Sequence, residues 1–313
     1  MKRQFWLLLA VLTILVGCEK SQVYSSSPKD PQTPETPEPP KEPEITYTVV
    51  RSAFSTTRDD LKVGGYVYTP EELDGKKPAM IFCTGLDATY EATEPYAIEM
   101  TKRGFVSCCF DFCGGPDEES TSLSDGSKAD NTISTELLDL EAVLNAVSAR
   151  EDVDPDNIIL LGGSQGGLVA ALYAAQNPSA FKALGLLFPA FNLPDLIREG
   201  VHDKIGDVDV STIPDFLFPI TSQGHKFYKK YIVDIVTIYP FDVIGAYKGP
   251  VLLIHGALDP LVPVYVSERA VETYDDVTYH VIADQGHGFD AEGTAQAIKY
   301  FDDFLTEAGL LQD

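Results

Sequence analysis

IILLGGSQGGL, residues 158–168, combines a short apolar run, a glycine-rich turn and the start of an alanine-rich helical segment. This order is typical of the G-x-S-x-G nucleophile elbow, where a serine takes strained backbone angles and small neighbours let strand and helix approach closely. A phosphate-binding loop is the alternative, but no Lys-Ser/Thr pair follows the glycines, and the first βαβ unit lies well upstream. The sequence therefore predicts that Ser164 holds its Oγ at the edge of a sheet.

A nucleophilic serine needs a histidine as its base and a carboxylate to orient that histidine. His287 lies in DQGHGF, residues 284–289, after the last predicted strand and before the final helix. This glycine-flanked loop is expected at the carboxyl edge of the sheet, where a base is needed. Of the other histidines, His280 falls within a strand, His255 ends one, and the remaining two lie in an irregular insertion.

Asp259 is the predicted acid, because it lies just beyond the seventh predicted strand in HGALDPLVP, residues 255–263. The chain order Ser164, Asp259, His287 matches the order that accompanies a G-x-S-x-G motif. Asp111, which ends an earlier strand, and Asp284, which is close to the histidine in sequence, are competing carboxylates.

An oxyanion hole needs backbone N–H groups from the residue after the nucleophile and from the loop after the third strand. These positions are Gln165 and Leu86. Gly85 precedes Leu86 and allows a tight turn there. Because the donors are backbone groups, side-chain identity constrains them weakly.

From residue 45 onward, predicted strands alternate with predicted helices, which is typical of a mostly parallel sheet covered on both faces. The predicted strands cover residues 45–54, 61–68, 79–84, 105–112, 157–162, 183–188, 251–255 and 277–283, and the predicted helices 95–103, 133–150, 165–176, 264–274 and 291–308. We expect the first two strands to pair antiparallel, with a bulge at Gly64 and Gly65. The fold class is therefore α/β, with eight strands flanked by helices.

Residues 190–239 break this rhythm, because they are rich in Phe, Tyr, Ile and Pro without strand alternation. An insertion after the sixth strand would overhang the carboxyl ends of the strands, where open α/β sheets bind ligands. This cap, about residues 190–240, offers five aromatic side chains as candidate substrate-binding groups: Phe216, Phe218, Phe227, Tyr228 and Tyr231. The alternative is that most of them form the cap's own small core.

Composition limits the partners of the chain. With 313 residues, a formal net charge of −25 and a pI near 4.4, the chain is unsuited to nucleic acid, whose phosphates require a basic face. An acidic protein repels anionic substrates, so neutral or cationic substrates are favoured electrostatically. The chain is long enough for one catalytic domain plus an appendage, and no stretch after residue 20 is apolar and long enough to span a bilayer.

The N-terminus has the pattern of an export signal. Lys2 and Arg3 precede an apolar run from Phe5 to Val16, and LVGC, residues 15–18, closes the segment. This ending resembles the lipobox of bacterial lipoproteins, in which cleavage precedes the cysteine and its sulfur carries a diacylglycerol. The resemblance implies that residues 1–17 are removed and that Cys18 anchors the protein to a membrane. An ordinary signal peptide or an uncleaved anchor is the alternative.

The segment after Cys18 is expected to be a linker, so that the domains are residues 18–44 as linker and 45–313 as catalytic domain. Prolines recur every third residue from Pro28 to Pro43, which matches the three residues per turn of polyproline II. Such a chain is a semi-rigid spacer that extends about 3.1 Å per residue.

Four further cysteines lie on or just after apolar runs: Cys83, Cys108, Cys109 and Cys113. They lack C-x-x-C spacing and have no histidine nearby, so neither a zinc site nor another metal site is predicted. Buried free thiols are expected, with a disulfide at Cys113 left open.

The chain from about residue 45 to its end resembles the α/β-hydrolase superfamily, and within it the cinnamoyl and feruloyl esterase-like group. Four stretches carry this resemblance: FDFCGG at 110–115, GGSQGG at 162–167, IHGALD at 254–259 and GHGF at 286–289. The resemblance implies hydrolysis of carboxylic esters through a serine acyl-enzyme, without a cofactor. Where members of the group often have His-Gly and Gly-His-Ser, this chain has Thr84-Gly85 and Gly162-Gly163-Ser164, which bears on substrate choice more than on catalysis.

The expected protein is an exported, lipid-anchored serine esterase at the periplasmic or cell surface. Its expected partners are small-molecule or polysaccharide-linked esters, such as acetyl or hydroxycinnamoyl esters of plant polysaccharide, and the membrane that holds Cys18; the sequence leaves the oligomeric state open. Two other functions remain open: a peptidase with the same triad, and a noncatalytic binding lipoprotein on the same fold.

Overall fold

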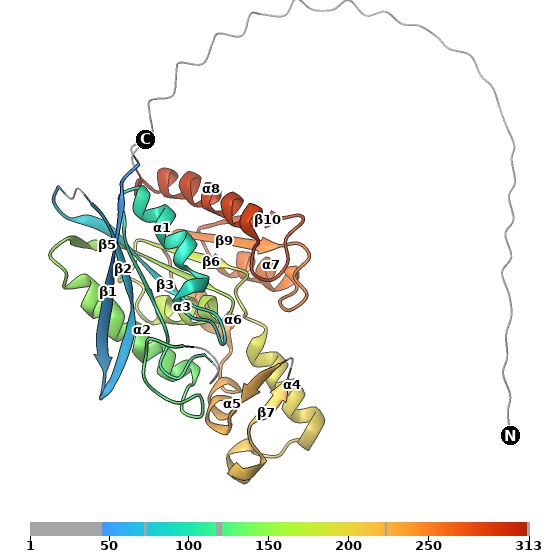
Figure 1. Ribbon diagram of the computed structural model, residues 1–313. Coiled ribbons are helices and arrows are strands. Elements are labelled where there is room, and N and C mark those ends of the chain that lie inside the picture. Colours follow the sequence, from blue (N-terminus) through green and yellow to red (C-terminus); the bar gives the residue numbers. More distant parts are fainter. Residues whose placement is uncertain (1–45, 72–73, 117–120, 223, 312–313) are drawn as a thin grey trace, which may run out of the picture. The chain divides into compact units, whose positions relative to one another are not determined.

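Apolar strands buried on both faces form the centre of the computed structural model, which describes residues 46–71, 74–116, 121–222 and 224–311 (Figure 1). The predicted signal segment, the predicted lipidation site Cys18 and the predicted linker lie outside the described residues. The strands of the main sheet are β1 (Val49–Arg58), β2 (Leu61–Pro70), β3 (Lys77–Cys83), β4 (Val106–Phe110), β5 (Val153–Gly163), β6 (Ala183–Leu187), β9 (Val251–Gly256) and β10 (Val277–Ile282).

The main sheet has eight strands in the order β1-β2-β4-β3-β5-β6-β9-β10. The first two pairings, β1 with β2 and β2 with β4, are antiparallel, and every later pairing is parallel. The sequence-based expectation of a mostly parallel eight-stranded sheet opened by an antiparallel pair is therefore confirmed.

Helices cover both faces of the sheet (Figure 1). They are α1 (Glu94–Lys102), α2 (Ile133–Ser148), α3 (Gln165–Gln176), α7 (Val264–Thr273) and α8 (Ala291–Glu307). Short 3-10 turns occupy Tyr90–Ala92, Val210–Thr212, Asp215–Leu217 and Ile244–Ala246.

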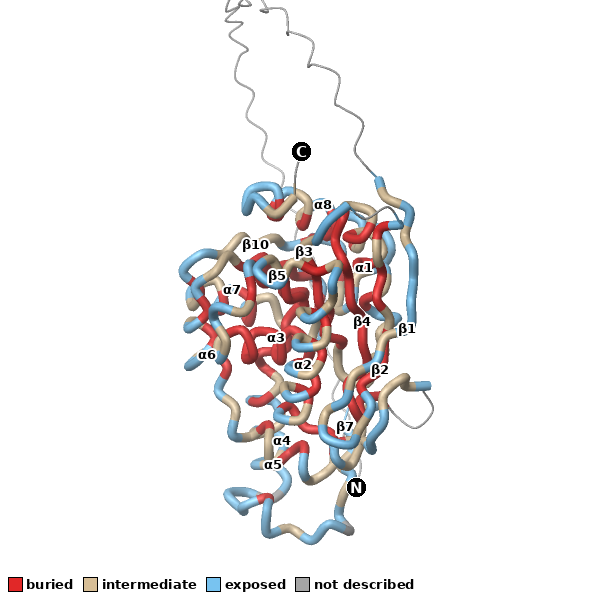
Figure 2. Tube along the Cα trace, turned by 90° about the vertical axis from the view of Figure 1, so that its left-hand side faces the viewer, coloured by how far each residue is buried: buried red, intermediate tan, exposed pale blue. Residues whose placement is uncertain are grey.

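Alternate side chains of β3 point to opposite faces of the sheet and belong to two separate hydrophobic core clusters. Met80 and Phe82 pack with residues of α1 and α8, whereas Ala79 and Ile81 pack with residues of α2, α3 and α7. Figure 2 shows the buried residues following the central strands and α3. Because both faces of the strand are covered, residues 79–83 of β3 are an unbroken apolar run instead of an alternating one.

Gly64 and Gly65 do not form the predicted bulge, so that prediction is wrong. Their pairing with Ser55 and Phe54 keeps the unbroken register of the β1–β2 ladder. A Cβ on Gly65 would lie 2.1 Å from the carbonyl oxygen of Cys109, and a Cβ on Gly64 would lie 2.2 Å from a neighbouring carbonyl oxygen. The glycines therefore serve the close approach of neighbouring backbone.

The predicted cap lies between β6 and β9. It comprises α4 (Leu193–Ile205), two short strands β7 (Ile220–Ser222) and β8 (His225–Phe227), and α5 (Lys229–Ile235), and α6 (Pro240–Val243) follows it. The strands β7 and β8 pair antiparallel in a separate two-stranded sheet. With three residues each, they are too short to give a recognisable alternation, which is why the sequence predicted no strand here.

All four cysteines of the described part, Cys83, Cys108, Cys109 and Cys113, are buried and free. Burial raises the pKa of Cys113 to about 12, so its thiol stays protonated at neutral pH. Among the helices of the described residues, none has the length and apolar character needed to cross a membrane.

Substituting Gly65 with Ala is expected to destabilise the protein by about 1–3 kcal/mol, because the new methyl group would overlap the Cys109 carbonyl. Gly200 is the matched control, because it is exposed within α4 and has no atom within 4 Å of an added Cβ. Gly200→Ala should raise stability by up to about 1 kcal/mol. Urea unfolding followed by circular dichroism measures both, and equal stabilities of the two variants would contradict the packing argument.

Candidate active site

Ser164 lies between the last residue of β5 and the first residue of α3, with φ 53° and ψ −122°. A non-glycine residue in this region costs about 1–3 kcal/mol. The turn is tight, because a Cβ on Gly162 would lie 2.2 Å from the Gly166 carbonyl oxygen and one on Gly166 would lie 2.3 Å from the Cys83 carbonyl oxygen. Gly162 and Gly166 are therefore required sterically, as expected for a nucleophile elbow.

Three side chains that are far apart in sequence meet at this turn. The Ser164 hydroxyl donates to Nε2 of His287 at 2.8 Å, and Nδ1 of His287 donates to Oδ2 of Asp259 at 2.7 Å. The histidine comes from the loop after β10, and the aspartate from the loop after β9. The structure thus brings together the three residues that the sequence predicts as nucleophile, base and acid, at distances suited to proton transfer.

The Asp259 carboxylate is buried and fully engaged. Its Oδ1 accepts from the amides of Leu261 and Val262 at 2.8 and 2.9 Å, while Oδ2 accepts from His287. Burial alone would raise the pKa of Asp259, but hydrogen bonds from His255, His287 and the two amides outweigh it and hold this pKa well below its usual value. Asp259 therefore remains ionised and can orient the imidazole and stabilise its protonated form.

His255 is a site residue that sequence reasoning treated only as a strand end. Its ring is fully buried, with Nε2 donating to the Val262 carbonyl at 2.8 Å and lying 3.4 Å from Oδ2 of Asp259, while Nδ1 lies 2.6 Å from the Ser267 hydroxyl. The ring thus braces the turn that carries the acid. Its position four residues before Asp259, at the end of a buried strand, was the available signal.

Neither of the two competing carboxylates, Asp111 and Asp284, makes the hydrogen bond to His287 that Asp259 makes. Asp284 is exposed. Asp111 is buried and accepts from the amides of Tyr90 and Leu123 at 2.6 and 2.7 Å, so it fastens two loops. Burial raises the pKa of Asp111 in spite of these bonds.

The two predicted oxyanion donors border Ser164. Gln165 is the first residue of α3, so its amide belongs to the first-turn N–H groups that have no acceptor within a helix. Leu86 lies in the loop after β3, and a Cβ on Gly85 would lie 3.4 Å from Cβ and 3.9 Å from Oγ of Ser164. The loop therefore lies directly against the serine side chain, and the oxyanion role of the two amides stays a prediction.

Phe188 borders the site and was not predicted from the sequence. It follows β6 with a positive φ of 38°, and its ring centroid is 4.9 Å from those of His287 and Phe289. The edge-on contact of Phe188 with His287 holds the imidazole ring from one side. The positive φ at the strand end is a tertiary feature that the local sequence does not signal.

The cap aromatics that were predicted to bind substrate differ in their placement. Phe227 and Tyr231 are buried, 6% and 3% exposed, and their rings are 5.4 Å apart in the main core cluster. Phe218 and Tyr228 are half-buried. The side chain of Phe216 lies outside the described residues. Burial of Phe227 and Tyr231 favours the alternative interpretation, in which they build the cap's core.

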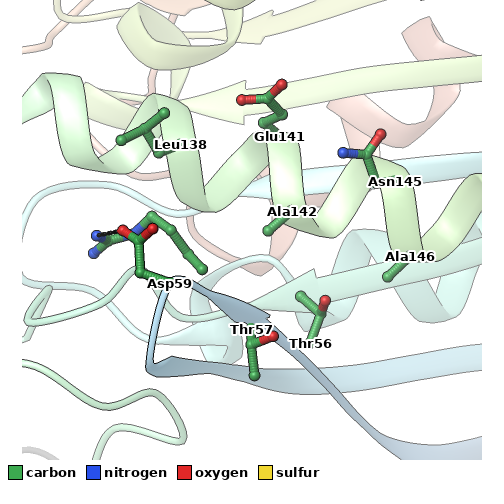
Figure 3. Close-up of a pocket in the computed structure, with 9 residues that line it drawn as sticks. Thr56, Thr57, Asp59, Leu138, Glu141, Ala142, Asn145 and Ala146 are labelled. Atoms are coloured by element: carbon green, nitrogen blue, oxygen red, sulfur yellow. Dashed lines mark ion pairs between the residues drawn. The ribbon is translucent and has the colours of Figure 1, made fainter.

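A separate hollow of about 520 Å³ lies between β1 and α2 (Figure 3). It is lined by Thr56, Thr57, Arg58, Asp59, Leu138, Glu141, Ala142, Asn145 and Ala146. Neither Ser164 nor His287 nor Asp259 lines it, so this hollow is distinct from the site built around the serine.

Known proteins resemble this chain in sequence and in fold. Residues 93–309 match the prolyl oligopeptidase family. A protein of Mycobacterium tuberculosis described as uncharacterised is 27% identical over 267 residues, which cover 83% of this chain and 81% of that protein. The alpha/beta hydrolase domain-containing protein WAV2 of Arabidopsis thaliana is 30% identical over 132 residues, 41% of this chain and 38% of that one.

Among solved structures, Est1E from Butyrivibrio proteoclasticus with bound ferulic acid superposes with a TM-score of 0.69 at 25% identity. The match covers 81% of this chain and 99% of that one. The fold is therefore that of the α/β-hydrolases, as the sequence motifs predicted.

The depressed pKa of Asp259 predicts an acid-dependent loss of stability. A group whose folded pKa is lowered contributes stability above its unfolded pKa and loses it as the pH falls toward the folded value. Between pH 6 and 3, the unfolding free energy of the wild type should fall by about 1 kcal/mol more than that of Asp259→Asn. Asp284→Asn is the control and should follow the wild type, because that side chain is exposed. Parallel pH curves for wild type and Asp259→Asn would contradict the assignment.

Proposed function

This chain belongs to the prolyl oligopeptidase family, and we propose that it is a serine hydrolase that cleaves small carboxylic esters. The observation that carries the proposal is the chain of two hydrogen bonds, 2.8 and 2.7 Å, that runs from Ser164 through His287 to Asp259. Its setting on an α/β-hydrolase fold, at a strained turn between strand and helix, supports the same conclusion.

In the proposed reaction, Ser164 Oγ attacks the ester carbonyl carbon while Nε2 of His287 takes the hydroxyl proton. The carbonyl π electrons move to oxygen, and the amides of Leu86 and Gln165 stabilise that oxyanion. Collapse expels the alcohol, which receives its proton from His287. Water then attacks the acyl-enzyme with His287 as base, and the acid leaves as Ser164 regains its proton. Asp259 keeps the Nδ1 proton in place throughout.

For the substrate, we favour small acyl esters, with acetyl or hydroxycinnamoyl groups on plant polysaccharide as the candidates. Ferulic acid is the ligand named for the similar Est1E structure. The ring of Phe188 packs against those of His287 and Phe289, so aromatic side chains border the base, and this setting is compatible with a flat aromatic acyl group.

A peptidase is the second candidate, because the matched family is that of prolyl oligopeptidase. The same triad can cleave amides, so the preference has to be measured. Turnover of p-nitrophenyl acetate and methyl ferulate against a panel of proline-containing peptide amides separates the two: an esterase should leave the peptide amides uncleaved, whereas a peptidase should cleave them in addition to the intrinsically more reactive esters.

Ser164→Ala should keep the thermal unfolding of the wild type and lose nearly all ester turnover, because the nucleophile is removed from an otherwise unchanged fold. A fluorophosphonate probe should label the wild type and not the variant. Equal activity of the variant would mean that another nucleophile acts. Absence of labelling in folded wild type would favour the noncatalytic binding lipoprotein instead.

Asp259→Asn should lower kcat by several orders of magnitude, by about 10⁴-fold in the best-known triad, because the imidazole loses its orienting carboxylate. Asp284→Asn is the matched control, since it removes an exposed carboxylate from the loop of the same histidine. Ester turnover of the control should stay within about twofold of wild type. A larger loss of kcat from Asp284→Asn than from Asp259→Asn would assign the role of the acid to Asp284.

The membrane anchor at Cys18 is a further part of the proposal, and it rests on the lipobox-like segment alone. Expressed in a bacterial host with labelled palmitate, the full chain should incorporate the label and partition with membranes. Cys18→Ser should incorporate no label and should be released, with ester turnover unchanged. Equal labelling of the variant would exclude this anchor.

A further inference from the structure

The side chain of Gln165 is held from two sides. It is 1% exposed; its Oε1 accepts from the Tyr231 hydroxyl at 2.6 Å, and its Nε2 donates to both carboxylate oxygens of Glu136 at 2.8 and 2.9 Å. Tyr231 belongs to α5 of the cap, and Glu136 to the first turn of α2. Gln165, which directly follows Ser164, is therefore fixed between α5 of the cap and α2, one of the helices that cover the main sheet.

Glu136 is an unusual residue to find at this place. It is fully enclosed by protein and accepts from Nδ2 of Asn131 at 3.1 Å as well as from Gln165. Burial raises the pKa of Glu136 to about 7, although these hydrogen bonds and the charge of Lys128 lower it. Burying a carboxylate is costly, and packing alone does not require it. Both carboxylate oxygens of Glu136 instead accept from Gln165, the residue whose backbone amide is the predicted oxyanion donor.

The loop that carries the other oxyanion amide is held in a similar way. Asp87 directly follows Leu86 and has a positive φ of 57°, in a turn closed by the Ala88 amide donating to the Gly85 carbonyl at 3.2 Å. Non-glycine residues at positive φ are strained, so this turn needs support.

Two side chains give the turn that support. Nδ1 of His225, in β8 of the cap, donates to Oδ2 of Asp87 at 2.6 Å, and the ammonium group of Lys128 pairs with Oδ1. Lys128 also donates to the Gly115 carbonyl at 2.5 Å. As at Gln165, one partner comes from the cap; the other, Lys128, comes from the segment that leads into α2, the helix that carries Glu136.

We propose that the cap positions the oxyanion hole, through Tyr231 on Gln165 and His225 on Asp87, with Glu136 and Lys128 as the opposing supports. This inference rests on the proposed serine hydrolase function and assigns a role to the cap beyond forming a pocket wall. Tyr231 is a positioning residue in this account, and its hydroxyl acts through Gln165 without touching the substrate.

Positioning an oxyanion donor affects the transition state more than the bound ester, because the negative oxygen develops only in the transition state. A displaced amide should therefore lower kcat and kcat/KM together while KM stays nearly constant. A residue that merely stabilises the fold should change neither parameter in molecules that remain folded.

The test compares Tyr231→Phe with Tyr247→Phe on p-nitrophenyl acetate in the full-length protein. Each variant removes one buried hydroxyl, and in Tyr247 that group donates to the Phe181 carbonyl at 3.2 Å, away from the serine. Tyr231→Phe should lower kcat about 10-fold, less than the about 10²–10³-fold loss on removing an oxyanion donor outright, with KM within about twofold. Tyr247→Phe should lose only stability. Equal kcat values in the two variants would overturn the proposal.

A second pair keeps the test decisive if Tyr231→Phe fails to fold. Glu136→Gln replaces one of the two oxygens that accept from Gln165 by a donor NH2 group and so weakens the opposing support, whereas Asp139→Asn changes another buried carboxylate of α2, which pairs with Arg58. We expect a kcat loss with constant KM only for Glu136→Gln. Combining Glu136→Gln with Tyr231→Phe should cost little more than the larger single effect, because both act through Gln165. If the effects of the two substitutions on kcat were fully additive, or if Asp139→Asn lowered kcat equally, then Glu136 and Tyr231 would not act together through Gln165.

The outcomes also separate this inference from the proposed function. Fluorophosphonate labelling and ester turnover of the wild type test the triad, whereas the variant pairs test the positioning of the amides. If the wild type hydrolyses the ester and the pairs do not differ, the cap inference fails and the hydrolase proposal stands.

Discussion

The backbone of Ser164 is the constraint on which the rest of the site depends. Its positive φ is unfavourable for a side chain, and both of its peptide groups are fastened to the end of the neighbouring strand. The Ser164 amide donates to the Leu187 carbonyl at 3.0 Å, and its own carbonyl accepts from the Ala190 amide at 2.9 Å. Relaxing this backbone conformation would break the two hydrogen bonds, so they keep the Ser164 hydroxyl fixed where it meets His287.

Because this constraint is steric, it leaves a signature in the sequence. Gly162 and Gly166 are needed where strand, helix and the end of β3 touch, because a Cβ at either position would overlap neighbouring backbone. The same local logic made Asp259 and His287 recognisable, since each lies in a short loop directly after a buried strand. Parallel strands align their carboxyl ends, so their loops converge and the triad geometry follows from the order of elements.

Features that depend on pairing between distant segments could not be predicted in this way. The role of Gly65 is set by the carbonyl of Cys109 on the adjacent strand, which a bulge prediction from a Gly-Gly pair cannot foresee. The bracing of the acid turn by His255 and the contact of Phe188 with the base likewise require three-dimensional neighbours. Periodicity identifies buried faces but not their partners, and the cap, with its short strands, offers little periodicity to use.

If the cap positions the oxyanion hole, its two halves are under different constraints. The contacts with Asp87 and Gln165 come from β8 and α5, the second half. The exposed large apolar side chains Leu196, Val208 and Leu217 all precede β7 and are free of those contacts. Substitutions of these exposed side chains in the first half should therefore leave the two amides in place. Substitutions in the second half, in contrast, reach the side chains that hold Asp87 and Gln165, so this half of the cap is constrained by the geometry of the two amides as well as by its own packing.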